Sequence, residues 1–397
     1  KFDVVKERFA DQAMVPLTLY GETYALPMTM SFSMMFYRKD IFAELDINVP
    51  NTWDDFYDII YSLQSNSLEI GFPQGTGGSL LMMYQEDEEM YDEGNYDYYL
   101  ELFQRYYYDG NFDEISESEL SELNDQLFEM GLTYMATDEE GNLIQRPKTD
   151  GITINLDSDI SLATFKTVCD FFTMYDFPIT FDFANRFRSG EMPLAIMDYT
   201  AYNTLIVFAP EINGLWEFTP LPGTADPLTH KISNDTIGGI STVMLMNSVS
   251  NKETEAFGSW AFMQWYLSKD IQSAYGNEMV ALLGPSAKQP TANMNALANM
   301  AWSTEEYNNL FAQFNGVACT PEYPGGYIIG RYTTFAFLDV VNDSADPIEE
   351  MQSQITDINV ELTRKREEFG LPTADSIKEM LDVVNEKYEN WNEGGNE

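Results

Sequence analysis

The hydrophobic and polar positions along this chain alternate between helical spacing and short apolar runs. Apolar residues that recur every three to four positions predict amphipathic helices, and apolar runs between turn residues predict strands. The longest run, Met28–Tyr37, predicts a strand buried on both faces. Alternating helices and short strands indicate an α/β fold. The predicted helices are Leu162–Tyr175, Phe183–Arg188, Thr254–Leu267, Asp270–Tyr275, Met294–Trp302, Glu305–Phe314, Tyr332–Val341, Pro347–Phe369 and Ala374–Trp391, and the other predicted strands are Pro193–Met197, Trp216–Pro222 and Gly238–Met246.

The N-terminal residues carry a specific series of local elements. Lys1–Ala13 is predicted as the end of a helix and Tyr20–Thr23 as a turn. Tyr24–Pro27 is expected to be an extended segment that Pro27 ends, because proline lacks a backbone N–H. The residues up to Phe56 therefore predict a turn, a crossing strand and then helices.

Two helix caps follow the long strand. Asp40 is expected to cap a short helix, Ile41–Leu45. Either Asn51 or Thr52 is expected to cap the next helix, whose first turn holds two aspartates where the helix dipole favours negative charge. Further on, Asp138–Asn142 has the residues of a hairpin turn.

Composition restricts the partners. The chain has 397 residues, 44% of them hydrophobic, which is enough to bury a large core. Its 65 acidic and 21 basic residues give a net charge of -44. Such a surface repels phosphate backbones and anionic lipids, so we expect neither nucleic acid nor an anionic membrane surface as a partner. An acidic, tyrosine-rich stretch at 84–122 is expected to be a helical insertion.

The motifs give no positive indication of catalysis. His230 is the sole histidine, which excludes a histidine triad or a multi-histidine metal site within this chain, and it is expected to lie in an exposed loop. Cys169 and Cys319 make no metal set; Cys169 is expected to be a buried thiol, and the sequence leaves their pairing open. Gly75–Ser79 lacks the lysine of a phosphate-binding loop. We expect no metal and no cofactor.

A cluster of aromatic and polar residues follows one predicted strand. Asp198–Asn203 contains Tyr199 and Tyr202 and comes directly after the strand Pro193–Met197. The carboxyl end of a strand in an α/β sheet faces the ligand crevice. Aromatic rings and carboxylates there suit a sugar, although a core role for the two tyrosines fits the pattern about equally well.

The order of several short motifs resembles the family 1 extracellular solute-binding proteins of ABC importers, a group that includes maltose- and oligosaccharide-binding proteins. No motif is specific alone, but together they cover most of the chain in the family's order. Arg38 departs from the family's usual asparagine. The motifs are Tyr20-Gly21 with Tyr24–Pro27, Phe36–Phe42, Pro50–Phe56, Phe187–Met197, Pro220–Gly223, Ile237–Ile240 and Ala256–Gln272.

The resemblance implies a type II periplasmic-binding-protein-like fold, in which two α/β lobes close on a ligand about a hinge. It assigns residues 1–30 plus 236–324 to the first lobe and residues 31–235 plus 325–397 to the second. Relatives carry about one hundred further residues before the Tyr24–Pro27 motif, and this chain carries few. The first lobe is therefore expected to be incomplete, and truncation is favoured over a natural half-lobe variant.

The resemblance also implies a ligand site. Its expected members are Ser31, Phe32, Asp198, Tyr199, Tyr202, Gly238, Gly239, Arg331 and Tyr332. The implied function is non-catalytic binding of an oligosaccharide and its delivery to the transmembrane permease subunits of an ABC importer. A monomer is expected, attached to the surface of a Gram-positive cell by a lipid anchor in a preceding leader.

Two other functions stay open at this level. A secreted glycoside-active enzyme would need a pair of carboxylates about 5 to 10 Å apart. Because the chain has 65 acidic residues, the sequence alone does not tell whether such a pair exists. A sensor or scaffold module could keep the same fold without transport.

Overall fold

The computed structural model describes residues 2–19, 22–73, 133–137, 143–147, 156, 159–225, 230–250, 252–319 and 326–369. The predicted segments at 75–79, 84–122, 138–142 and 374–391 lie outside these ranges. Two compact units divide the chain: Lys1–Asp87 with Ala163–Glu322 and Phe337–Ile348, and Glu88–Leu162 with Tyr323–Ala336 and Glu349–Glu397. They do not coincide with the predicted lobes, and that division into lobes stays a prediction.

The first unit is built around a mixed sheet. The described strands pair in the order β12-β11-β3-β7-β4, and β8 also pairs with β3. The strands are β3 (Ala25–Arg38), β4 (Ile70–Gly71), β7 (Leu194–Asp198), β8 (Trp216–Thr219), β11 (Thr236–Met244) and β12 (Val317–Ala318). The first unit also contains two short antiparallel strand pairs. They are β1 (Thr18–Leu19) with β2 (Glu22–Thr23), and β9 (Thr224–Ala225) with β10 (Ile232–Ser233).

The helices of the first unit follow the predicted order. They are α1 (Asp3–Lys6), α2 (Asp11–Met14), η1 (Val15–Leu17), α3 (Lys39–Glu44), α4 (Trp53–Ser65), most of α8 (Asp159–Thr173), α9 (Phe183–Ser189), α10 (Ala201–Phe208), η4 (Pro210–Ile212), α11 (Asn247–Ser250), α12 (Glu253–Tyr266), α13 (Lys269–Leu283), η5 (Pro285–Ala287), α14 (Met294–Leu297) and α15 (Thr304–Phe314). In the second unit the structure describes the hairpin of β5 (Thr133–Thr137) and β6 (Leu143–Pro147), the first part of α16 (Tyr327–Asp343) and most of α17 (Pro347–Glu368).

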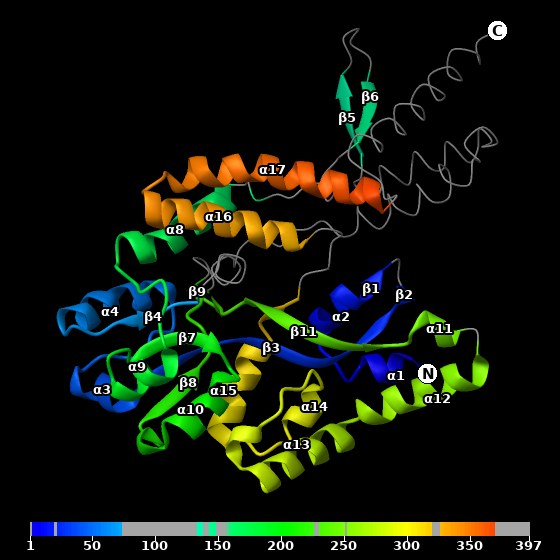
Figure 1. The fold of residues 1–397 in the computed structure, drawn as a ribbon, viewed down its shortest axis with the longest axis horizontal. Helices are drawn as coiled ribbons and strands as arrows, with labels where there is room; N and C mark the ends of the chain where they lie inside the picture. The colour runs from blue at the N-terminus through cyan, green and yellow to red at the C-terminus, as the bar shows by residue number, and fades with distance from the viewer. Residues whose placement is uncertain are drawn as a thin grey trace. The chain divides into compact units, whose positions relative to one another are not determined.

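Strand β3 changes partners along its length. Residues from Ala25 to Phe32 pair with β11, whereas those from Ser33 onward pair with β7, and β8 joins from Met35. Figure 1 shows β3 as a long strand that runs beside β11 and continues to β7 and β8. One strand therefore joins two groups of elements that are far apart in sequence.

Several local predictions were wrong. Pro27 does not end a segment but lies inside β3, at a register shift opposite Ser241 and Thr242, where a bulge tolerates the missing N–H. Asp40 does not cap α3; its carboxylate accepts from the Arg38 guanidinium at 2.7 and 2.8 Å. The helix predicted up to Trp302 ends at Leu297. Lys1–Ala13 contains two short helices instead of one.

One large hydrophobic cluster lies on the face of the sheet that carries Met30, Phe32 and Met34 of β3. Met30, Phe32 and Met34 of β3 are 1, 4 and 0% exposed, and they share a cluster with Tyr199, which follows β7, and with aromatic side chains of β8 and α10. A second aromatic group, in which Phe56 of α4 and Phe171 of α8 pack with ring centroids 5.9 Å apart, holds α4 and α8 together. None of the helices in the described ranges is long and apolar enough to cross a membrane.

Candidate functional site

A row of small polar residues crosses the sheet where β3 changes partners. Ser33 lies opposite Asp198 of β7, and Ser31 lies opposite Gly239 of β11. Directly opposed residues of an antiparallel pair share one face of the sheet. Thr29 and its partner Ser241 extend the same row. We call the set Thr29, Ser31, Ser33, Asp198, Gly239 and Ser241 the polar strip.

The residues of the polar strip on β3 are accessible because they alternate along the strand with core residues that point to the opposite face. Thr29, Ser31 and Ser33 are half-buried, whereas the residues between them are buried on the other face. Gly239 is exposed, and a side chain there would bring its Cβ within 3.1 Å of the Ser31 Oγ. The absence of that side chain leaves room above the Ser31 hydroxyl.

Asp198 is oriented by the turn that follows its strand. Its Oδ1 accepts from the Thr200 backbone N–H at 2.9 Å and from the Thr200 hydroxyl. These bonds engage Oδ1, and Oδ2 accepts none within the described ranges. Asp198 therefore offers an acceptor oxygen beside the hydroxyl of Ser33.

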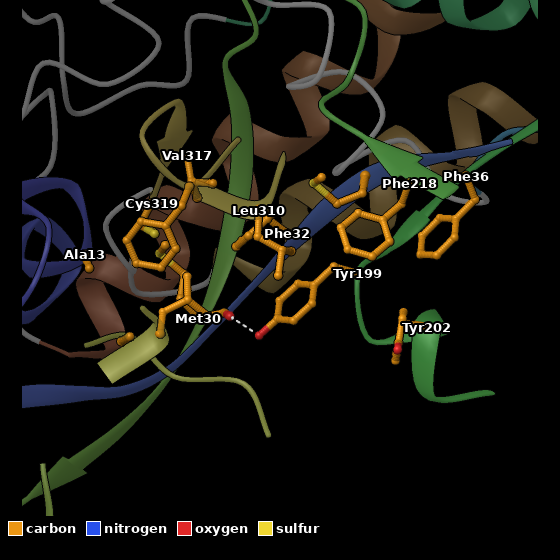
Figure 2. Close-up of a cluster of buried hydrophobic side chains, with 14 of the residues drawn as sticks. Ala13, Met30, Phe32, Phe36, Tyr199, Tyr202, Phe218, Leu310, Val317 and Cys319 are labelled. Atoms are coloured by element: carbon orange, nitrogen blue, oxygen red, sulfur yellow. Dashed lines mark hydrogen bonds between the residues drawn. The ribbon is translucent and has the colours of Figure 1, made fainter. Parts of the chain in front are cut away.

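Four of the predicted site residues lie on the opposite, core face. The Tyr199 ring packs on Phe32 with centroids 4.8 Å apart, and its hydroxyl donates to the Met30 carbonyl oxygen at 3.3 Å (Figure 2). A Cβ at Gly238 would lie 2.3 Å from the Val317 side chain. Tyr202 is 7% exposed. The structure thus brings Ser31, Asp198 and Gly239 together and places Phe32, Tyr199, Tyr202 and Gly238 in the packing beneath them.

Arg331 and Tyr332 lie in the part of α16 that belongs to the second unit. Arg331 is exposed, with its guanidinium 5.5 Å from the Phe335 ring. Tyr332 is half-buried, and its ring centroid lies 5.8 Å from that of Phe335. Both residues form contacts within their own helix.

Tyr202 belongs to a cage around a buried lysine. The Lys288 Nζ lies 4.2 Å from the centroid of the Tyr202 ring and 3.8 Å from that of Trp302. It donates to the Tyr202 hydroxyl at 3.1 Å and pairs with Glu306 at 3.4 Å. Burial lowers the pKa of Lys288 and raises that of Tyr202. The ammonium thus lies over one face of the Tyr202 ring and one face of the Trp302 ring. Tyr202 is therefore a contact within the packed structure.

The described side chains form no nucleophile or metal set. Cys169 and Cys319 are free and buried, and burial raises the pKa of each thiol to about 12, so both are protonated at neutral pH. His230 is exposed, as predicted. No group of three histidine, cysteine or acidic residues in the described ranges could hold a metal ion.

The sequence carried a pattern that would have found the polar strip. The order Thr29-Met30-Ser31-Phe32-Ser33-Met34 alternates polar with apolar residues, which is typical of a strand with one buried face and one solvent-accessible face. The prediction of a strand buried on both faces fits the second half of β3, where Met34, Met35 and Phe36 are all fully buried. It is wrong for the first half.

Comparison with known proteins identifies the family. The model for bacterial extracellular solute-binding proteins matches residues 2–273, so the chain belongs to that family. Membership implies an extracellular or periplasmic location. A segment of 54 residues is 41% identical to a binding protein of Brucella abortus strain 2308, and it covers 13% of this chain and 13% of that relative.

Solved structures share the fold. The sugar-binding protein MalE of Xanthomonas citri matches with a TM-score of 0.63 at 14% identity, over 92% of this chain and 78% of that one. An ABC transporter solute-binding protein of Thermotoga lettingae TMO, bound with α-D-tagatose, matches with a TM-score of 0.58 at 16% identity, over 91 and 79% of the two chains. The predicted type II periplasmic-binding-protein-like α/β fold is confirmed.

Proposed function

We propose that this protein binds a carbohydrate over the polar strip and delivers it to an ABC importer. The observation that carries the proposal is the composition of the strip, which aligns hydroxyls with the carboxylate of Asp198 on one half-buried face. Hydroxyl groups donate and accept hydrogen bonds and a carboxylate accepts them, so the strip can satisfy both the hydroxyl hydrogens and the hydroxyl oxygens of a sugar. The sugar-binding relatives with the same fold support the choice of ligand class.

The change of partners along β3 supports a hinge at the strip. The part of β3 before the Phe32–Ser33 peptide bond pairs with β11, and the part after it pairs with β7. Closure of the two groups about that point would enclose a sugar and present the closed form to permease subunits. This hinge lies close to the predicted boundary between residues 30 and 31, and the predicted assignment of residues to lobes is part of the proposal.

Isothermal titration calorimetry with a panel of maltose, maltotriose, cellobiose and raffinose tests the ligand class. A Gly239→Val variant fills the space above Ser31 and should abolish binding. Gly258→Val, at an exposed position of α12 where an added Cβ has no atom within 4 Å, is the matched control and should bind normally. Equal binding by the two variants, or no heat from any sugar, contradicts the proposal.

A further inference from the structure

The polar strip consists of three successive pairs of opposed residues, which we call rungs. In order, the first, second and third rungs are Ser33–Asp198, Ser31–Gly239 and Thr29–Ser241. All six residues are half-buried or exposed. Four residue steps along β3 separate Ser33 from Thr29, which corresponds to roughly 13 Å in a β-strand. The strip is therefore long and narrow, and it follows the direction of β3.

Buried residues limit the strip at both ends. The next pair on the same face beyond the first rung is Met35 with Ile196, and both residues are 0% exposed. At the other end the register shifts directly after the third rung, and Pro27, which lies opposite Thr242, is buried. A ligand on this face can therefore reach three rungs of β3 and no fourth one.

The three rungs differ in chemistry. The first rung holds the Asp198 carboxylate, and hydrogen bonds to a charged acceptor are about twice as strong as neutral ones. The second rung has no side chain at Gly239, so a ligand can lie closest to the sheet there. The third rung offers the hydroxyls of Thr29 and Ser241 and no charge. A ligand should therefore be held most strongly at the first rung and extend over the other two.

We infer that the polar strip takes a neutral, linear oligosaccharide of about three rings, which lies along β3 with one terminal ring at Asp198. This inference rests on the proposed function and adds the length, charge and direction of the sugar. A single pyranose ring is too short to contact all three rungs, whereas three linked rings can contact one rung each. None of the six residues is a cation, so an acidic sugar would face the Asp198 carboxylate without compensation.

Isothermal titration calorimetry with two series of sugars tests the inference. The series run from glucose to maltotetraose and from glucose to cellotetraose. In at least one series the affinity should rise about three- to tenfold with each added ring, since each rung adds about one net hydrogen bond. The affinity should level off at three rings, because a fourth ring reaches no further rung. Trigalacturonate, which carries a charge on each ring, should give no heat.

Variants at the two ends of the strip test the direction of the sugar. Thr29→Val combined with Ser241→Ala removes both hydroxyls of the third rung, so the three- to tenfold preference for a trisaccharide over a disaccharide should fall to about one. Asp198→Asn should weaken the binding of every length and keep that preference. Thr254→Val, at an exposed position of α12, is the control away from the strip and should change neither value.

The outcomes separate this inference from the proposed function. The inference is overturned if affinity is independent of length in both series, if it still rises at the fourth ring, if trigalacturonate binds as well as the neutral trisaccharides, or if the double variant keeps the preference for three rings. In each of these cases a sugar binds, and the proposed function stands. No heat from any sugar contradicts both.

Discussion

At the scale of single residues, Lys288 is a charged group buried within the first unit. Its side chain is 7% exposed and places the ammonium against two aromatic rings, and the side chain of Glu306, which pairs with it, is 26% exposed. A cation on the faces of Tyr202 and Trp302 gains from both ring quadrupoles. The backbone carbonyl of Lys288 also accepts from the Asn203 amide at 2.9 Å, which fixes the segment against α10.

Replacing Lys288 by Met keeps the apolar stem and removes the charge. Glu306 then loses its cation while it stays half-buried, and we expect a loss of about 2 kcal/mol in the free energy of unfolding. Urea denaturation measures it. The control is Lys252→Met, which breaks the exposed Lys252–Glu255 pair and should change stability by less than about 0.5 kcal/mol. Equal effects in the two variants would show that the cage contributes nothing.

The same residues predict a dependence on pH. Burial raises the pKa of Glu306, but the Ser303 backbone N–H and the Lys288 charge together outweigh it and hold that pKa below its ordinary value. A carboxyl with a depressed folded pKa stabilises the protein above its unfolded pKa of about 4.3, and this stability is lost as pH falls through the folded value. The stability advantage of the wild type over Glu306→Gln should therefore be full at about pH 6 and shrink below about pH 4.

Thermal unfolding of both proteins at a series of pH values measures this difference. Glu305→Gln, one position earlier on the same helix, controls for the removal of a negative charge from this part of the surface. If the difference in stability between the wild type and Glu306→Gln stayed constant from neutral to acid pH, the depressed pKa of Glu306 would be contradicted.

At the scale of elements, α4 shows how far local sequence determines structure. The two candidate caps were Asn51 and Thr52, and the structure selects Thr52. Its hydroxyl accepts from the Asp55 N–H at 3.1 Å, while the Asp55 carboxylate accepts from the Thr52 N–H at 3.0 Å. Both residues lie within one turn, so sequence could predict the cap.

Loss of that capping box should destabilise the helix. Thr52→Ala removes the hydroxyl acceptor, and we expect a decrease of about 1 kcal/mol in the free energy of unfolding. Chemical denaturation checks the value against Thr254→Ala, an exposed position in the first turn of α12 that should be nearly neutral. If the two variants match, the bonds of Thr52 add no net stability.

Strand β3 shows what local sequence could not determine. Its existence followed from apolar content, but the change of partners at Phe32 depends on residues 165 positions away in β7 and 206 positions away in β11. Gly239 therefore joined Ser31 in the predicted site through resemblance alone, whereas Asp198 was also indicated by its place directly after the predicted strand Pro193–Met197. Tyr202 has the same aromatic chemistry as a sugar platform, and sequence alone could not see that Lys288 occupies its ring face.

At the scale of the whole molecule, two surface properties oppose each other. Large apolar side chains are exposed on α12, where Phe257, Phe262 and Trp265 are 72, 58 and 54% exposed, and Met244 and Met246 at the end of β11 are 62 and 70% exposed. Exposed apolar surface of this kind favours association. The net charge of -44 repels a second copy, and that repulsion is long-ranged at low salt.

Salt should therefore decide whether this chain self-associates. The Debye length falls from about 30 Å at 0.01 M to about 10 Å at 0.1 M salt, so added salt screens the charge but leaves the apolar attraction intact. We expect the weight-average mass in sedimentation equilibrium to rise with salt at fixed protein concentration. Phe257→Lys combined with Phe262→Lys should remove the rise, whereas Tyr61→Lys, which changes an 80% exposed aromatic on α4, should not. A mass that stays monomeric at high salt would mean that the α12 face does not drive association.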